Sequence, residues 1–233
     1  MQQGRLALQT RCGLKSSLPG KLDDMALLKK KFYFVRHGET DWNKMSLCQG
    51  HTDIALNDTG KKQAEALGEK IGTFPFCSIW ASPLKRAHET ALILNKSLPH
   101  LSMTLVDELK ERYYGQFEGG SSKGMREIDD HEEKNPHFYS EKGVEPKEKL
   151  KERLIQGINQ ALQASVCPLI VSHGRVFMEL CQILNVPIVR QVPNTALILC
   201  QPTASGSDMS DIEEYVAWFL IILIYCPLIN RGV

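Results

Sequence analysis

The sequence predicts an α/β fold, a three-layer sandwich in which a mainly parallel sheet carries helices on both faces. The first observation behind this prediction is an alternation. From residue 32 onward, apolar runs of strand length are followed by longer segments with helical period. The second is composition, because 42% hydrophobic and 24% charged residues in a chain of 233 form an ordinary globular mixture. We therefore expect a folded protein rather than a fibrous or disordered one.

The expected elements follow in chain order. Phe32 to Val35 is a short run of large apolar residues, as in a strand, and residues 57–59 offer polar caps for a helix that runs through Ile71. Further apolar runs predict strands at 77–81, 101–106, 168–171 and 196–200. Longer periodic segments predict helices at 84–98, 148–164 and 176–184. This alternation of strands and helices is typical of parallel pairing.

The two ends of the chain depart from this pattern. Residues 1–30 are basic at first, with no acidic side chain before Asp23, and we expect a disordered extension, a targeting peptide being the alternative. Residues 216–229 contain no charge. Because a membrane span needs about 20 apolar residues, we expect a strand buried on both faces there, with membrane or partner contact as the alternative. Residues 31–233 are expected to form a single domain.

A third unusual stretch is residues 118–149, which we call the cap segment. It holds 9 acidic and 6 basic side chains but only five large apolar ones: Met125, Ile128, Phe138, Tyr139 and Val144. We expect it to stay outside the core. It is either a solvated excursion or a mobile cap over a site, the two common uses of long irregular segments.

Charge and cysteine content exclude several classes of function. The chain has 28 basic and 27 acidic side chains, so no overall field draws it to nucleic acid or to an anionic membrane. Its seven cysteines form no CxxC pair that could begin a zinc site or a redox motif. Reduced thiols in the cytoplasm are the expectation, and we assign no chemistry to them.

Polar clusters follow four of the expected strands, at the point where each strand ends. The first strand is followed by RHGETDWN at 36–43, the next by Ser82 and Arg86, the third by Glu108 and Glu111, and the fourth by SHG at 172–174. Ligands bind at the carboxyl ends of strands in open parallel sheets, so these side chains are expected to share one pocket.

The residue types in this pocket favour phosphate over a metal ion. Arginine presents a planar fork that matches phosphate oxygens, and glycine beside each histidine permits close backbone approach at a helix start. A zinc site at His37 and His173 is the rival. Two neighbouring guanidinium groups repel a dication, however, and no third ligand has suitable spacing.

The same residues resemble a known family, the histidine phosphatase superfamily, also called phosphoglycerate mutase-like. The resemblance covers about residues 31–201. Its five blocks are RHGETDWN at 36–43, QGHTDIALNDTG at 49–60, SPLKRAHETA at 82–91, DELKERYYGQFEG at 107–119 and VSHG at 171–174. The resemblance implies the phosphoglycerate mutase-like fold and chemistry that uses no metal and no cofactor.

Carried over residue by residue, the resemblance implies that His37 is the nucleophile and becomes phosphorylated. Arg36, Arg86 and His173 would bind the transferring phosphoryl group, and Glu111 would be the general acid and base. Substrate-binding roles would fall to Asn43, Thr40, Gln49, Gly50 and Gly174. Two arginines and a protonated His173 would supply the positive charge that magnesium supplies in other phosphoryl transferases.

The resemblance leaves hydrolysis and phosphoryl transfer both open. The separation of 62 positions from Glu111 to His173 and the cap segment's net charge of −3 favour a phosphatase over a cofactor-dependent mutase. A catalytically silent binding module on the same fold is the alternative from another class, because folds are reused. The expected partner is a small phosphomonoester, with no nucleic acid.

Overall fold

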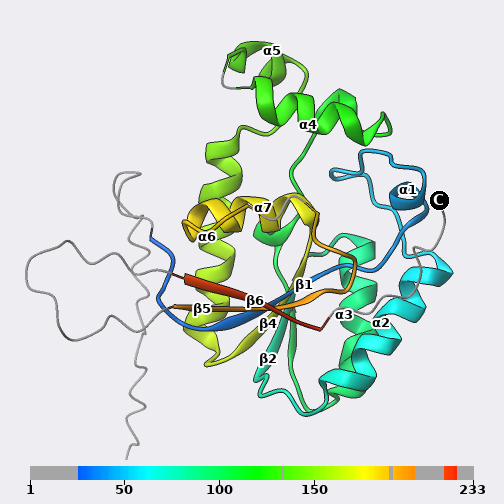
Figure 1. Ribbon diagram of the computed structural model, residues 1–233, viewed down its shortest axis with the longest axis vertical. Coiled ribbons are helices and arrows are strands. Elements are labelled where there is room, and N and C mark those ends of the chain that lie inside the picture. The colour runs from blue at the N-terminus through cyan, green and yellow to red at the C-terminus, as the bar shows by residue number, and fades with distance from the viewer. Residues whose placement is uncertain (1–25, 133, 189–190, 203–217, 225–233) are drawn as a thin grey trace, which may run out of the picture.

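The fold is built on a six-stranded sheet in the order β3-β2-β4-β1-β5-β6. The computed structural model describes residues 26–132, 134–188, 191–202 and 218–224. Its strands are β1 (Phe32–Arg36), β2 (Ser78–Ala81), β3 (Met103–Leu105), β4 (Pro168–Ser172), β5 (Leu197–Pro202) and β6 (Trp218–Ile224). The first four strands pair in parallel. Strand β5 pairs antiparallel to β1, and β6 pairs antiparallel to β5. This confirms the predicted fold class (Figure 1).

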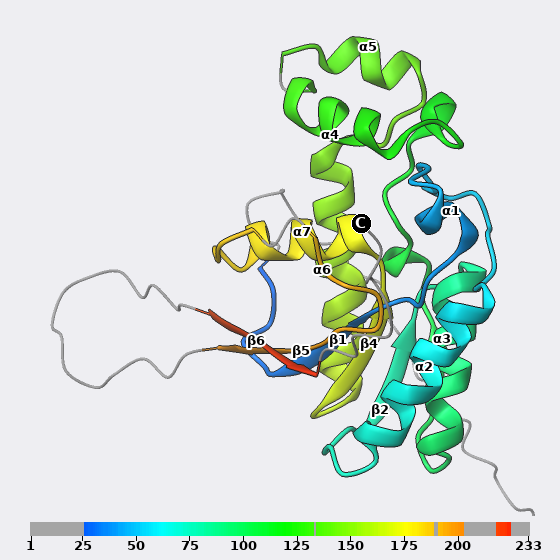
Figure 2. The same ribbon diagram turned by 45° about the vertical axis from the view of Figure 1, so that its right-hand side comes forward.

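Helices cover both faces of the sheet because side chains along a strand alternate between the faces. From β1, Phe32 and Phe34 pack with α6 (Lys147–Ala164) and α7 (Gly174–Ile183). Tyr33 and Val35 point the other way and pack with α2 (Asp58–Ile71) and α3 (Lys85–Ser97). Figure 2 shows these two helix pairs on opposite sides of the strands. The strands therefore read as continuous apolar runs, as sheets buried on both faces do.

The predicted helices and strands are present, with small shifts at their ends. Asn57 caps α2, its side-chain oxygen accepting from the Gly60 amide at 2.8 Å. Helix α7 begins at Gly174, two residues before the predicted start. Glycine has a low helix propensity, so the sequence pattern alone indicates a later start. Strand β3 covers only residues 103–105 and lies at an end of the sheet order, where it pairs on one side.

The expectation that the cap segment contributes nothing to a core was wrong. It forms α4 (Ser122–His131) and α5 (Pro136–Glu141), which lie beyond the sheet in Figures 1 and 2. Ile128 and Val144 are buried with Cys48 and Tyr114 in a third, small apolar cluster. The few apolar residues of the segment suffice because Cys48 and Tyr114 come from outside it. Two short 3₁₀ helices precede α4, at Asp107–Leu109 and Gly115–Phe117.

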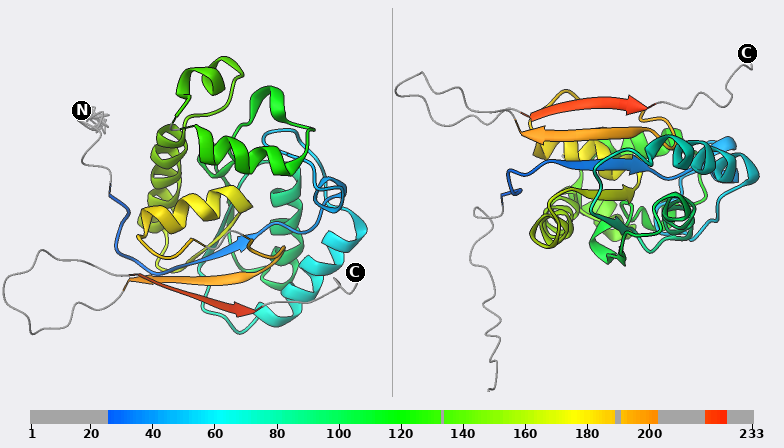
Figure 3. Two further views of the ribbon diagram at one scale, coloured as in Figure 1. Left: turned by 45° about the horizontal axis from the view of Figure 1, so that its top comes forward. Right: turned by 90° about the horizontal axis from the view of Figure 1, so that it is seen from below.

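The apolar tail forms a strand, as expected. Strand β6 runs antiparallel to β5 at the end of the sheet order (Figure 3). Its side chains and residues 225–229 are not described, so burial on both faces stays a prediction. The expected extension at residues 1–30 falls almost wholly on residues 1–25, outside the described chain. No helix among the described residues is long and apolar enough to cross a membrane.

Candidate active site

His37 follows β1 and is almost completely buried. Its Nδ1 lies 2.7 Å from the Gly38 carbonyl oxygen. A carbonyl oxygen only accepts hydrogen bonds, so Nδ1 must carry the proton. In the neutral ring the lone pair then belongs to Nε2, the atom that remains for attack on a phosphorus centre.

The backbone after His37 leaves no room for a side chain at Gly38. The Gly38 amide donates to the Thr90 hydroxyl at 3.0 Å, which draws this turn against α3. A Cβ atom added at Gly38 would lie 2.5 Å from the Gly60 carbonyl oxygen at the start of α2. Glycine is therefore required at position 38, because this turn packs tightly between α2 and α3.

His173 lies beside His37 because β4 and β1 are neighbours, with Arg36 opposite Ser172. The two rings are 5.2 Å apart between centroids, and the His173 Nε2 lies 2.8 Å from the Ser82 hydroxyl oxygen. The other ring nitrogen, Nδ1, is buried and has no hydrogen-bond partner among the described residues. Two histidines that are 136 positions apart in the chain thus meet at the carboxyl ends of neighbouring strands.

The two arginines have the same incomplete hydrogen bonding. Arg36 donates from Nη1 to the Val192 carbonyl, and Arg86 donates from Nη2 to the Gly50 carbonyl at 2.7 Å and from Nη1 to the Thr52 carbonyl at 3.1 Å. The Nε atom of each is buried without a partner in the described part of the chain. A buried donor without a partner lowers the stability of the folded protein, so these nitrogens are well placed to donate hydrogen bonds to a bound anion.

Burial and charge set the protonation of these groups. Desolvation lowers the pKa of Arg86 to about 10, although nearby carboxylates including Glu111 oppose the shift, so it is charged at neutral pH. Burial, the largest cause, and the positive charge of Arg86, the second largest, lower the pKa of His37 and of His173 well below the usual range. Protonation of His173, expected from the sequence, is therefore disfavoured by its surroundings and needs an anion beside the ring. Desolvation and the positive charge of Arg86 keep its imidazole neutral.

Glu111 lies at the N-terminus of α7 and is also buried. Its Oε1 accepts from the Arg112 amide at 3.0 Å and the Val176 amide at 3.2 Å, and its Oε2 accepts from the Arg175 amide at 3.2 Å. These three amides fix the position of the Glu111 carboxyl group beside the start of α7. Glu111 also acts electrostatically on Arg36 and Arg86, so it shares the site with them.

Of the five residues expected to bind substrate, Gly50 and Gly174 lie against the two arginines of this group. Thr40 and Asn43 form a capping box on α1 (Asp41–Lys44), in which the Asn43 carbonyl oxygen accepts from Thr40 and leaves its amide group as a donor. Gln49 is buried, and Gly50 supplies a carbonyl to Arg86. A Cβ at Gly174 would lie 3.4 Å from the Arg36 Nε.

Several contacts around the site involve residues to which the sequence gave no role. The Asn194 amide donates to the His37 carbonyl at 2.8 Å. Arg153 donates to the carbonyls of Glu108, Lys110 and Glu111 at 2.7–2.9 Å. Glu118 binds the 50–52 loop. The only sequence signal was for Glu118, which belongs to the 107–119 block.

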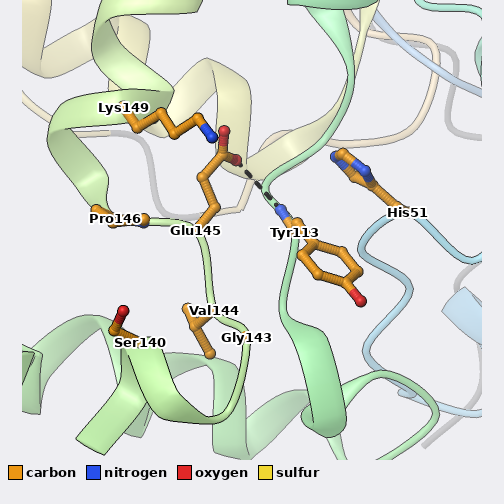
Figure 4. A pocket seen from close by; sticks show the side chains of 8 residues that line it. All are labelled: His51, Tyr113, Ser140, Gly143, Val144, Glu145, Pro146 and Lys149. Carbon is orange, nitrogen blue, oxygen red and sulfur yellow. Dashed lines mark hydrogen bonds between the residues drawn. The ribbon is translucent and has the colours of Figure 1, made fainter. Parts of the chain in front are cut away.

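A cavity of about 330 Å³ lies next to this site rather than in it. Figure 4 shows Lys149 and Pro146 on one side of this cavity's lining, Tyr113 and His51 on the other, and Glu145 between them. None of the proposed phosphate-binding residues lines it. We therefore identify the active site by its chemistry and not by this cavity. In the described parts of the chain, no three His, Cys, Asp or Glu side chains form a group that could hold a metal ion.

The lowered histidine pKa values predict acid sensitivity. Unfolded imidazoles take up protons near pH 6.5, whereas buried His37 and His173 do so only at lower pH. The free energy of unfolding is therefore unaffected by these two groups above about pH 6.5 and decreases as the pH falls below it. The decrease is about 1.4 kcal/mol per pH unit for each proton that the unfolded imidazole binds and the buried one does not. We expect the Tm to fall between pH 7.5 and 5, and to fall less in His173→Gln.

Thermal unfolding followed over this pH range measures both effects. His100, which is exposed, provides the matched control, and His100→Gln should keep the full pH dependence of the native protein. An unchanged pH dependence in His173→Gln would show that His173 does not withhold a proton in the folded state.

Comparisons with known proteins identify the family of this chain. A family model described as histidine phosphatase superfamily (branch 1) matches residues 32–213. The chain is 43% identical over 143 residues to an uncharacterized phosphatase, PhoE, of Bacillus subtilis, which covers 60% of this chain and 69% of that protein. It is 38% identical over 107 residues to a metal-independent phosphoserine phosphatase of Arabidopsis thaliana, covering 46% of this chain and 42% of that protein.

Solved structures show the same fold. The structure of YhfR from Bacillus stearothermophilus superposes with a TM-score of 0.65 at 23% sequence identity, covering 83% of this chain and 96% of the other.

Proposed function

Because the chain belongs to the histidine phosphatase superfamily, we propose that it hydrolyses a small phosphomonoester through a phosphohistidine at His37, without a metal ion. One observation carries the proposal: the His37 Nδ1 hydrogen bond to Gly38 reserves Nε2 for attack, beside buried donors that have no partner within the described chain. Those donors are Nε of Arg36 and Nε of Arg86, and Nδ1 of His173 is a further buried polar atom without a partner among the described residues.

The first step transfers the phosphoryl group to the enzyme. The Nε2 lone pair of neutral His37 forms a bond to phosphorus while the ester P–O bond breaks, and Glu111 gives its proton to the departing alcohol oxygen. Arg36 and Arg86 meet the charge on the three equatorial oxygens. An incoming phosphate dianion also favours protonation of His173, so this residue gains its charge on binding rather than before it.

The second step returns the enzyme to its starting state. Water attacks the phosphorus of phosphohistidine, the N–P bond breaks, and the electron pair returns to His37 Nε2. Glu111 accepts the proton of the attacking water, which restores the acid for the next turnover. The same fixed positive groups serve both displacements, because the phosphoryl group occupies one site throughout.

Two further observations support a phosphatase that acts on a small substrate. Two relatives carry the word phosphatase in their names, and one of these names specifies independence of metal. The cap segment has an excess of negative charge, which disfavours substrates with a second phosphate group.

A panel of phosphomonoesters assayed for phosphate release, with phosphoryl transfer to added alcohols or to 3-phosphoglycerate measured in parallel, tests this function. We expect release to exceed transfer, and we expect full activity after treatment with EDTA. The proposal of hydrolysis is wrong if transfer dominates. Metal independence is wrong if EDTA removes activity and added divalent ions restore it.

A further inference from the structure

Glu118 is a partly buried carboxylate for which the proposed mechanism has no use. It accepts four hydrogen bonds, all from two neighbouring segments. Its Oε1 accepts from the amides of His51 at 2.8 Å and Tyr114 at 3.1 Å. Its Oε2 accepts from the amide and the hydroxyl of Thr52 at 2.9 and 2.7 Å. Both oxygens are therefore fully engaged in fixing backbone.

The 50–52 loop connects Glu118 to Arg86. The loop directs its amide groups to Glu118 and directs the carbonyls of Gly50 and Thr52 to the Arg86 guanidinium. Gly50 has a φ of +51°, and a Cβ there would lie only 1.9 Å from the Glu118 Oε1. The loop is thus seated tightly between a carboxylate and a guanidinium, and Glu118 also opposes the lowering of the Arg86 pKa.

A second set of contacts connects Glu118 to Glu111. The His51 ring donates from Nε2 to the Glu111 carbonyl at 2.7 Å, because a carbonyl oxygen can only accept. Glu118 fixes the His51 amide directly and fixes Tyr114, three residues after Glu111. One carboxylate therefore holds backbone on both sides of the site.

We propose that Glu118 is a positioning residue that sets the Arg86 guanidinium and the Glu111 backbone relative to each other. This inference rests on the proposed function, since Arg86 binds the phosphoryl group and Glu111 transfers the proton. A displacement of about 1 Å at a reacting group can cost about a hundredfold in rate. Loss of the Glu118 contacts weakens phosphate binding through Arg86 and slows departure of poor leaving groups through Glu111.

Glu118→Gln is the informative variant because it keeps the shape of the side chain. Its NH₂ group faces backbone amides whichever way it is turned, so at least one of the amide contacts becomes a repulsion between donors. We expect kcat/KM for an alkyl phosphate to fall about 10- to 100-fold, with a smaller fall for p-nitrophenyl phosphate. Vanadate and inorganic phosphate should bind at least about fivefold more weakly.

Three other variants separate positioning from folding. Glu141→Gln makes the same change at an exposed carboxylate of the cap segment and should leave all values unchanged. Thr52→Val removes only the hydroxyl contact and should cost less than Glu118→Gln. Glu118→Asp keeps the charge but is one methylene shorter, so it should lose activity although its charge is intact.

Vanadate binding by calorimetry distinguishes failure of this inference from failure of the proposed function, since it requires no turnover. Native vanadate affinity and native kcat/KM in Glu118→Gln would overturn the positioning role. So would losses that are equal for both leaving groups and disappear when the assay is cooled well below the Tm of the variant. A native protein that binds vanadate but hydrolyses no phosphomonoester would instead overturn the proposed function.

Discussion

Replacement of His37 by alanine is expected to abolish hydrolysis, with kcat/KM reduced by about 10⁴-fold or more. The reason is that the proposed hydrolysis passes through a covalent phosphoenzyme. Without the Nε2 lone pair no phosphoenzyme forms, and Arg36 and Arg86 can then only bind the substrate. Rapid quenching of the native enzyme with labelled substrate should trap an acid-labile, alkali-stable phosphoryl group, and none should appear in His37→Ala.

The matched control for this experiment is His100→Ala, which removes an exposed imidazole that belongs to none of the proposed site residues. It should retain native activity and native labelling. Because the phosphate-binding donors remain in His37→Ala, this variant should still bind vanadate, which shows that it is folded. An active His37→Ala enzyme, or labelling that persists in it, contradicts the phosphohistidine mechanism.

Glu111→Gln has the second largest expected effect. Loss of the proton donor should slow hydrolysis of alkyl phosphates by about 10²- to 10⁴-fold. The loss should be much smaller for p-nitrophenyl phosphate, whose leaving group departs without protonation. Pre-steady-state measurement of nitrophenol release separates the two steps. A burst followed by slow turnover is expected, because the second step still lacks its base.

Lys149→Gln serves as a control for general disturbance, since Lys149 lines the neighbouring cavity and takes no part in the proposed chemistry. It should show no burst and no selective loss on poor leaving groups. Equal losses on both substrates in Glu111→Gln would mean that Glu111 binds substrate or maintains the fold rather than transferring a proton.

Much of the fold could be predicted because burial on both faces leaves a plain signature. Phe32 to Val35 forms a strand, and its four side chains divide between two cores. The cap segment was harder, because Ile128 and Val144 pack against Cys48 and Tyr114 from elsewhere in the chain. Apolar content within one segment cannot reveal a core that is shared between segments.

The candidate site shows the same division. His37 and His173 could be placed near each other because each follows a strand of one parallel sheet. The contacts of Glu118 with Thr52 and of Asn194 with His37 span 66 and 157 residues, and both join loops rather than strands. No periodicity relates such loops, so only the folded backbone reveals these partners.

The register of β1 against β4 has a consequence for how this protein can change. Arg36 lies opposite Ser172, which brings His37 and His173 side by side. An insertion of one residue within either strand would turn one histidine to the other face of the sheet. Helices α4 and α5 of the cap segment lie outside the sheet and carry no such constraint. Variation in length is therefore tolerated around α4 and α5 but not in the two strands, so this part of the protein can diverge while the two histidines keep their places.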